Sequence, residues 1–157
     1  MLVLASVCCE AAPDAGALIE QGDRQAEAGE LDAALQSYRL AIEADPASSL
    51  AHTRLGGMQM IRHEYPDSIA SFRKAIGIDP DNAAAFIGMG IAYLHLGQYS
   101  LSRAALLEAR QRSPQRRDEI EQLLAWLGNR APAPESAGEP LPEVQQPRHQ
   151  RCTRPLV

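Results

Sequence analysis

Apolar residues recur in the middle of the chain with the spacing of an amphipathic helix. Phe86, Met89, Gly90 and Tyr93 stand at i, i+3, i+4 and i+7, so they share one face of a helix. Gly97 then interrupts the pattern, and glycine readily adopts the left-handed conformation in which many helices end. After Gly97 the apolar positions resume with a helical spacing, up to a proline. This stretch therefore predicts two helices joined by a tight turn.

The same pattern is written three times, at a period of 34 residues. The stretches GELDAALQSYRLAIEADP, HEYPDSIASFRKAIGIDP and GQYSLSRAALLEARQRSP each end in proline, which stops a helix because the preceding residue is driven out of the α region. Their alignment divides the chain into units 15–48, 49–82 and 83–116. The matching columns are Gly22, Gly56 and Gly90; Ala34, Ser68 and Ser102; Tyr38, Phe72 and Leu106; Ala41, Ala75 and Ala109; and Pro46, Pro80 and Pro114.

The glycine column requires a physical cause. A glycine inside a helix costs about 1 kcal/mol relative to alanine, and here it occurs three times in register. We expect the two helices of each unit to approach closely at this point, with the small residues of the second helix packed against the glycine. Pro66 is expected at the start of a second helix, where its missing N–H is harmless.

A further helix is predicted at 117–129. Ile120, Leu123 and Leu127 repeat the apolar face, but Leu124 takes the place of the glycine. Because no partner helix follows, close approach is not needed, and a polar outer face is typical of a capping helix. Gly128 and the residue after it are expected to end this helix.

The two ends of the chain differ in composition from the repeats. Residues 130–157 contain six of the eleven prolines and few apolar residues, which predicts a disordered tail. Residues 1–14 are either the remnant of a secretory signal or a fraying extension of a cytosolic protein. The compartment follows from that choice, periplasm or envelope in the first case and cytoplasm, slightly favoured, in the second. No apolar run reaches the roughly 18–20 residues that span a membrane.

The repeated columns resemble the tetratricopeptide repeat family, whose 34-residue unit is a helix–turn–helix. The third unit matches best, and the second and first units share the glycine, alanine and proline columns. The residues of the third unit that carry the match are Phe86, Met89, Gly90, Tyr93, Gly97, Ala109 and Pro114. The departures from the family pattern are Gln21, Gln25, His52 and Gln59. The resemblance implies an all-α fold, a right-handed α-solenoid of three helix pairs plus a C-terminal capping helix.

In this family the concave face formed by the first helices usually binds a peptide or protein segment. The positions that the resemblance assigns to such a groove are Ile19, Asp23, Ala26 and Glu27; Thr53, Gly57, Met60 and Ile61; and Ile87, Ile91, Leu94 and His95. The groove is acidic in the first unit and apolar in the other two, which suits a partner with an apolar or helical segment. The family's carboxylate clamp needs Lys, Asn and Arg, and only Arg54 lies near that pattern, so we predict no clamp.

The charge pattern argues against nucleic acid as a partner. The net charge is −5, whereas binding to nucleic acid rests on neutralising phosphates. The excess of 14 Arg over a single Lys is interpreted as a genome-composition bias of a bacterial kind. Arg110, Arg112, Arg116 and Arg117 form a local cluster that either grips an anionic partner or complements a helix C-terminus.

The residues do not assemble a catalytic or metal-binding pattern. No two of the four histidines have the helical i, i+4 spacing, and the three cysteines lie outside the repeats without zinc-ligand spacing. We therefore expect neither enzyme activity nor a metal or cofactor. The predicted function is protein–protein interaction, as an adaptor or assembly scaffold. The alternatives are self-assembly into a homo-oligomer through the groove and the solenoid ends, and an accessory subunit of an enzyme complex.

Overall fold

The computed structural model describes residues 14–130, so almost all of the predicted N-terminal extension and C-terminal tail lies outside the described residues. The described part is helical throughout. Its elements are α1 (Ala15–Glu27), α2 (Leu31–Ala44), α3 (Ser49–Ile61), α4 (Tyr65–Ile78), α5 (Ala83–His95), α6 (Tyr99–Arg112), the 3-10 helix η1 (Pro114–Arg116) and α7 (Arg117–Arg130).

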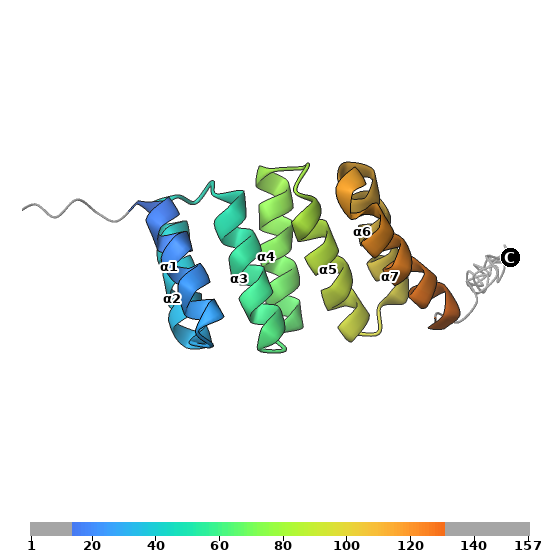
Figure 1. Ribbon diagram of the computed structural model, residues 1–157, viewed down its shortest axis with the longest axis horizontal. Helices are drawn as coiled ribbons and strands as arrows, with labels where there is room; N and C mark the ends of the chain where they lie inside the picture. Colours follow the sequence, from blue (N-terminus) through green and yellow to red (C-terminus); the bar gives the residue numbers. More distant parts are fainter. Residues whose placement is uncertain (1–13, 131–157) are drawn as a thin grey trace, which may run out of the picture.

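The helices form a single row of antiparallel pairs (Figure 1). Within each pair the two helices pack along their length, and each second helix also packs on the first helix of the next pair. The helices α1, α3, α5 and α7 form one layer and α2, α4 and α6 form the other, as both views show. This arrangement confirms the predicted all-α solenoid.

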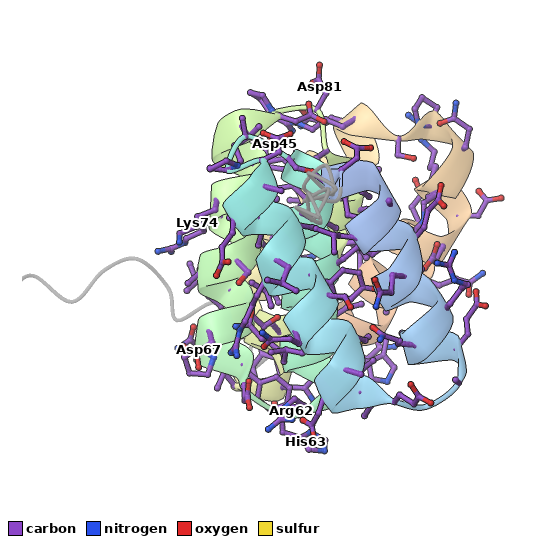
Figure 2. The ribbon with its side chains drawn as sticks, turned by 90° about the vertical axis from the view of Figure 1, so that its left-hand side faces the viewer. Asp45, Arg62, His63, Asp67, Lys74 and Asp81 are labelled. Carbon is purple, nitrogen blue, oxygen red and sulfur yellow. The ribbon has the colours of Figure 1, made fainter. Side chains whose placement is uncertain are left out.

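The turn inside each pair is built in the same way three times. Gly29, His63 and Gly97 occupy equivalent positions and have φ angles of 80°, 63° and 70°. In the third turn, Gln98 N–H donates to the carbonyl of Tyr93 at 2.9 Å, which closes the end of α5. Figure 2 shows His63 at one edge of the row, opposite Asp45 and Asp81, which lie in the turns between the pairs. The expected left-handed end at Gly97 is confirmed.

The glycine column marks a close approach, and a large side chain takes part in it besides the expected small residue. A Cβ atom on Gly22 would lie 2.5 Å from the ring of Tyr38, and one on Gly56 would lie 2.9 Å from the ring of Phe72. On Gly90 it would lie 3.0 Å from Leu106. The expected small residues are fully buried at this approach, and Ser68 Oγ donates to the Gly56 carbonyl at 2.8 Å. The large side chain one helical turn further on fills the remaining space above each glycine.

The capping helix α7 closes the core at the C-terminal end of the row. Ile120 and Leu127 are buried with Phe86 and Leu106, and Leu124 packs against the same cluster. The helix runs on to Arg130, through the glycine that was expected to end it. A glycine alone does not force a helix to end, and helix ends vary by one or two residues.

Candidate functional site

A cavity of about 490 Å³ opens on the layer of first helices. It extends over α1, α3 and α5 and ends at η1. Residues from all four elements line it, and two aromatic side chains reach it from the second helices. The lining comprises Asp23, Ala26, Glu27, Tyr38, Thr53, Arg54, Gly57, Met58, Met60, Ile61, Phe72, Ala84, Ile87, Gly88, Ile91 and Arg116.

Most of the residues that the resemblance assigned to a groove lie in this cavity. They are Asp23, Ala26, Glu27, Thr53, Gly57, Met60, Ile61, Ile87 and Ile91. Ile61 is half exposed, whereas Ile87 is almost fully buried at the cavity floor. Each of these residues comes from a first helix. Residues 34 positions apart in the sequence lie on neighbouring first helices of the row.

Three of the assigned residues lie elsewhere. Ile19 is 6% exposed and packs in the core of the first unit with Tyr38, because its side chain points between helices and not out of the layer. Leu94 packs against the apolar cluster of Phe86 and its neighbours. His95 is exposed and stacks on the ring of Tyr65, with 4.7 Å between the ring centroids. None of these three residues belongs to the cavity lining.

Other lining residues were missed by the sequence reasoning, above all Tyr38 and Phe72. Both belong to second helices, and the resemblance pointed only to first helices. Their rings pass beside Gly22 and Gly56 and emerge between the first helices of adjacent units. The signal that could have found them is the pairing of a large-aromatic column with a glycine column. Arg116 was considered only as part of an arginine cluster.

A hydrogen-bonded polar cluster lies where the first two units meet. The Tyr38 hydroxyl donates to Asp23 Oδ1 at 2.6 Å, and Arg54 Nε lies 2.9 Å from the same oxygen. Burial raises the pKa of Tyr38 above its usual range, and the hydrogen bond to Asp23 raises it further. The carboxylate, the guanidinium and the hydroxyl therefore satisfy one another in the wall of the cavity.

One repeat further on, the equivalent cluster is apolar. The residues 34 positions after Asp23, Tyr38 and Arg54 are Gly57, Phe72 and Gly88. A Cβ atom on Gly88 would lie 2.3 Å from Phe72 Cζ, so the ring occupies the space that a side chain at position 88 would need. The second junction thus holds a buried aromatic ring where the first holds an ion pair.

Two charged residues stand at opposite ends of the cavity. Glu27 belongs to α1 and has no ion-pair partner among residues 14–130, whereas Arg116 in η1 binds Glu119 through Nε at 2.9 Å and Nη2 at 3.0 Å. The hydrogen bond from Arg116 lowers the pKa of Glu119. Both Arg116 and Glu119 are about half exposed, so their pairing adds little stability.

Two other arginines of the predicted cluster, Arg110 and Arg112, make contacts within the protein. Arg112 Nε donates to the Pro80 carbonyl at 2.7 Å, and its guanidinium lies 4.5 Å from the centroid of the Phe86 ring. Arg110 lies 4.0 Å from Glu121 of α7. These contacts join the second unit, the third unit and the capping helix.

A second cavity of about 520 Å³ lies on the other side of the row, between α4 and α6. Its lining is largely apolar and includes Phe86, Met89 and Leu101. Arg73 at its edge donates a hydrogen bond to the Tyr93 hydroxyl at 2.9 Å.

Within residues 14–130, no three His, Cys, Asp or Glu side chains are grouped as a metal site would require. In the same part of the chain, no helix combines the length and the apolar character needed to cross a membrane.

The three-unit geometry agrees with comparisons to known sequences. Two family models, both described as tetratricopeptide repeat, match residues 19–83 and 60–127, and together they span the three helix pairs and most of α7. The chain belongs to the tetratricopeptide repeat family. Its helix pairs are tetratricopeptide repeats, and the cavity lies on the face formed by their first helices.

The relatives in sequence are much longer proteins. The chain is 30% identical over 89 residues to the peroxisomal targeting signal receptor of Komagataella phaffii, an alignment of 57% of this chain and 14% of the receptor. It is 37% identical over 65 residues to anaphase-promoting complex subunit 3 of Schizosaccharomyces pombe, covering 41% of this chain and 10% of that subunit. The alignments thus cover only 14% and 10% of the length of these relatives.

Several solved structures, among them tetratricopeptide repeat domains, have the same fold. The TPR2B domain of yeast Sti1, in a complex with pHsp70, has a TM-score of 0.71 at 21% identity, covering 73% of this chain and 96% of that domain. The first TPR of Spaghetti (RPAP3), bound to the HSP90 peptide SRMEEVD, has a TM-score of 0.71 at 17% identity, covering 75% and 93%. The type III secretion translocator chaperone SycD of Yersinia enterocolitica has a TM-score of 0.70 at 15% identity, covering 73% and 92%.

Proposed function

We propose that this protein is a non-catalytic interaction module, an adaptor or assembly scaffold, that binds a segment of a partner protein in the cavity on its first helices. The observation that carries this proposal is the apolar floor shared by two units, where half-exposed Ile61 and partly exposed Met60 of α3 and Ile91 of α5 adjoin the buried Ile87. A contiguous exposed apolar surface usually marks an interaction site. The TPR2B domain of yeast Sti1 in its complex with pHsp70 and the first TPR of Spaghetti bound to an HSP90 peptide support the same use of the fold.

A random peptide library displayed on phage tests this proposal on the full-length chain. We expect the wild type to enrich peptides with apolar residues, and we expect Met60→Glu combined with Ile61→Glu to lose them, because two carboxylates would stand on the cavity floor. The control is Leu40→Glu combined with Ile78→Glu, two residues of the second helices that are each 39% exposed and lie outside the cavity. Equal enrichment by both double variants would contradict the proposal.

Self-assembly through the same surface is distinguished by mass. Light scattering at two protein concentrations is expected to give the same monomer mass, since the proposed occupant is a partner segment. A mass that rises with concentration for the wild type and the control variant, but not for Met60→Glu combined with Ile61→Glu, would instead identify a second copy as the occupant of the cavity.

A further inference from the structure

The charge of the solenoid changes from one end to the other. The first unit, 15–48, carries seven acidic and two basic side chains, and the second unit, 49–82, carries four of each. The third unit together with the capping helix, 83–130, carries four acidic and six basic side chains. Because the units follow one another along the row in Figure 1, the two ends of the cavity lie in electrostatic fields of opposite sign.

The charges inside the cavity divide into a compensated centre and two exposed ends. Asp23 is held by both Arg54 and Tyr38, so neither member of this ion pair presents an uncompensated charge. Glu27 extends the negative end. At the positive end Arg116 is paired only with a neighbour three residues away, in an exposed contact that a partner carboxylate can replace at little cost.

We infer that the segment bound in this cavity is polarised in charge, with basic residues against α1, apolar residues across α3 and α5, and acidic residues against η1. The inference rests on the proposed function and adds the chemistry and the orientation of the occupant. A uniformly acidic segment would meet Glu27 and the negative first unit, and like charges in contact are unfavourable. A uniformly basic segment would meet the same repulsion at Arg116.

The peptides enriched from the phage library test this inference directly. We expect wild-type clones to carry Lys or Arg on one side of an apolar centre and Asp or Glu on the other. Glu27→Lys and Arg116→Glu should each weaken a selected peptide by about fivefold at low ionic strength, an effect that high salt removes. The matched controls are Glu43→Lys on α2 and Arg103→Glu on α6, which make the same charge changes at exposed residues outside the cavity.

The orientation is measured with a nitroxide label on a selected peptide. A label at the basic end should broaden the amide signals of α1, and a label at the acidic end should broaden those of 113–117. Reversed broadening, broadening around the second cavity between α4 and α6, or wild-type clones without this charge order would overturn the inference. The last result would leave the proposed function intact, whereas a library from which nothing is enriched would contradict the proposed function itself.

Discussion

The two junctions between adjacent units are packed in the same way but with different side chains. Polar and charged groups surround the aromatic ring between the first and second units, and apolar groups surround it between the second and third units. At the first junction Tyr38 emerges beside Asp23 and Arg54, and its hydroxyl is bound by the carboxylate at 2.6 Å. At the second junction Phe72 emerges where a Cβ on Gly88 would lie only 2.3 Å from the ring. At the first junction the hydroxyl of Tyr38 is therefore surrounded by two charged side chains. At the second junction Phe72 has no hydroxyl, and the two equivalent positions are glycines.

This difference shows how a repeat can vary without losing its fold. The ring at this position packs on the glycine of its own unit in both cases, so the helix pair keeps its geometry. The far end of the ring, a hydroxyl in Tyr38 and a C–H edge in Phe72, reaches the neighbouring unit. This end determines which residues can pack around it. A buried hydroxyl needs a hydrogen-bond partner, whereas a hydrocarbon edge needs space and apolar contact. The cavity is therefore bordered by charged side chains at the first junction and by a buried aromatic ring at the second.

Removing the ring of Phe72 should cause the largest loss of stability. Phe72→Ala is expected to destabilise the protein by about 3–5 kcal/mol, because a ring that is 2% exposed leaves a void between α3 and α5. Urea unfolding followed by circular dichroism measures the loss. If Phe72→Ala unfolds with the midpoint of the wild type, the ring is not a structural link between the units.

Filling the space beside the second ring should have a smaller effect. Gly88→Ala is expected to destabilise by about 1–2 kcal/mol, since overpacking outweighs the gain in helix propensity. The matched control is Gly57→Ala, where a Cβ would have no neighbour within 4 Å, and this change should stabilise by about 0.5–1 kcal/mol.

The two glycine substitutions also test whether Phe72 is the cause. In a Phe72→Ala background, Gly88→Ala should no longer destabilise, which gives a coupling of about 1 kcal/mol or more between the two positions. If Gly88→Ala has the same effect with and without the Phe72 ring, a contact other than Phe72 is the reason that position 88 requires glycine.

Breaking the polar cluster of Asp23, Tyr38 and Arg54 should reduce stability less than removing the Phe72 ring. Asp23→Ala is expected to destabilise by about 1–2 kcal/mol, because the Tyr38 hydroxyl loses its acceptor while Arg54 loses its partner. Adding Tyr38→Phe should recover part of the loss, since the hydroxyl is then no longer present. Denaturant melts of the two single variants and the double variant measure this recovery, and strictly additive losses would argue against the cluster.

The smallest expected effect is a dependence on alkaline pH. The pKa of Tyr38 is raised in the folded protein, so the folded state holds this proton more tightly than the unfolded state does. Its stabilising contribution is complete below the unfolded pKa of about 10 and is lost as the pH rises above it. Wild type should therefore lose more stability than Tyr38→Phe in melts above that pH, and parallel curves would exclude this role for the hydroxyl.

The sequence predicted the helix pairs better than the site because the two depend on interactions of different range. The 34-residue period, the prolines and the turn glycines act locally, and the observed helices follow them closely. The groove positions required the rotation of each helix within the solenoid. A small error in that rotation separates Met60, which lines the cavity, from Ile19 and Leu94, which pack inward.

By itself the sequence determined that this protein is a row of three helix pairs with a capping helix, since apolar periodicity and helix ends are set by neighbours along the chain. Only the tertiary structure decided that Tyr38 and Phe72 cross from the second helices into the cavity, and that Arg54 faces Asp23 from the next unit. The reason is that these contacts join residues of adjacent units. Their geometry exists only after the helices have packed, and the same repeat position can then meet either charge or an aromatic ring.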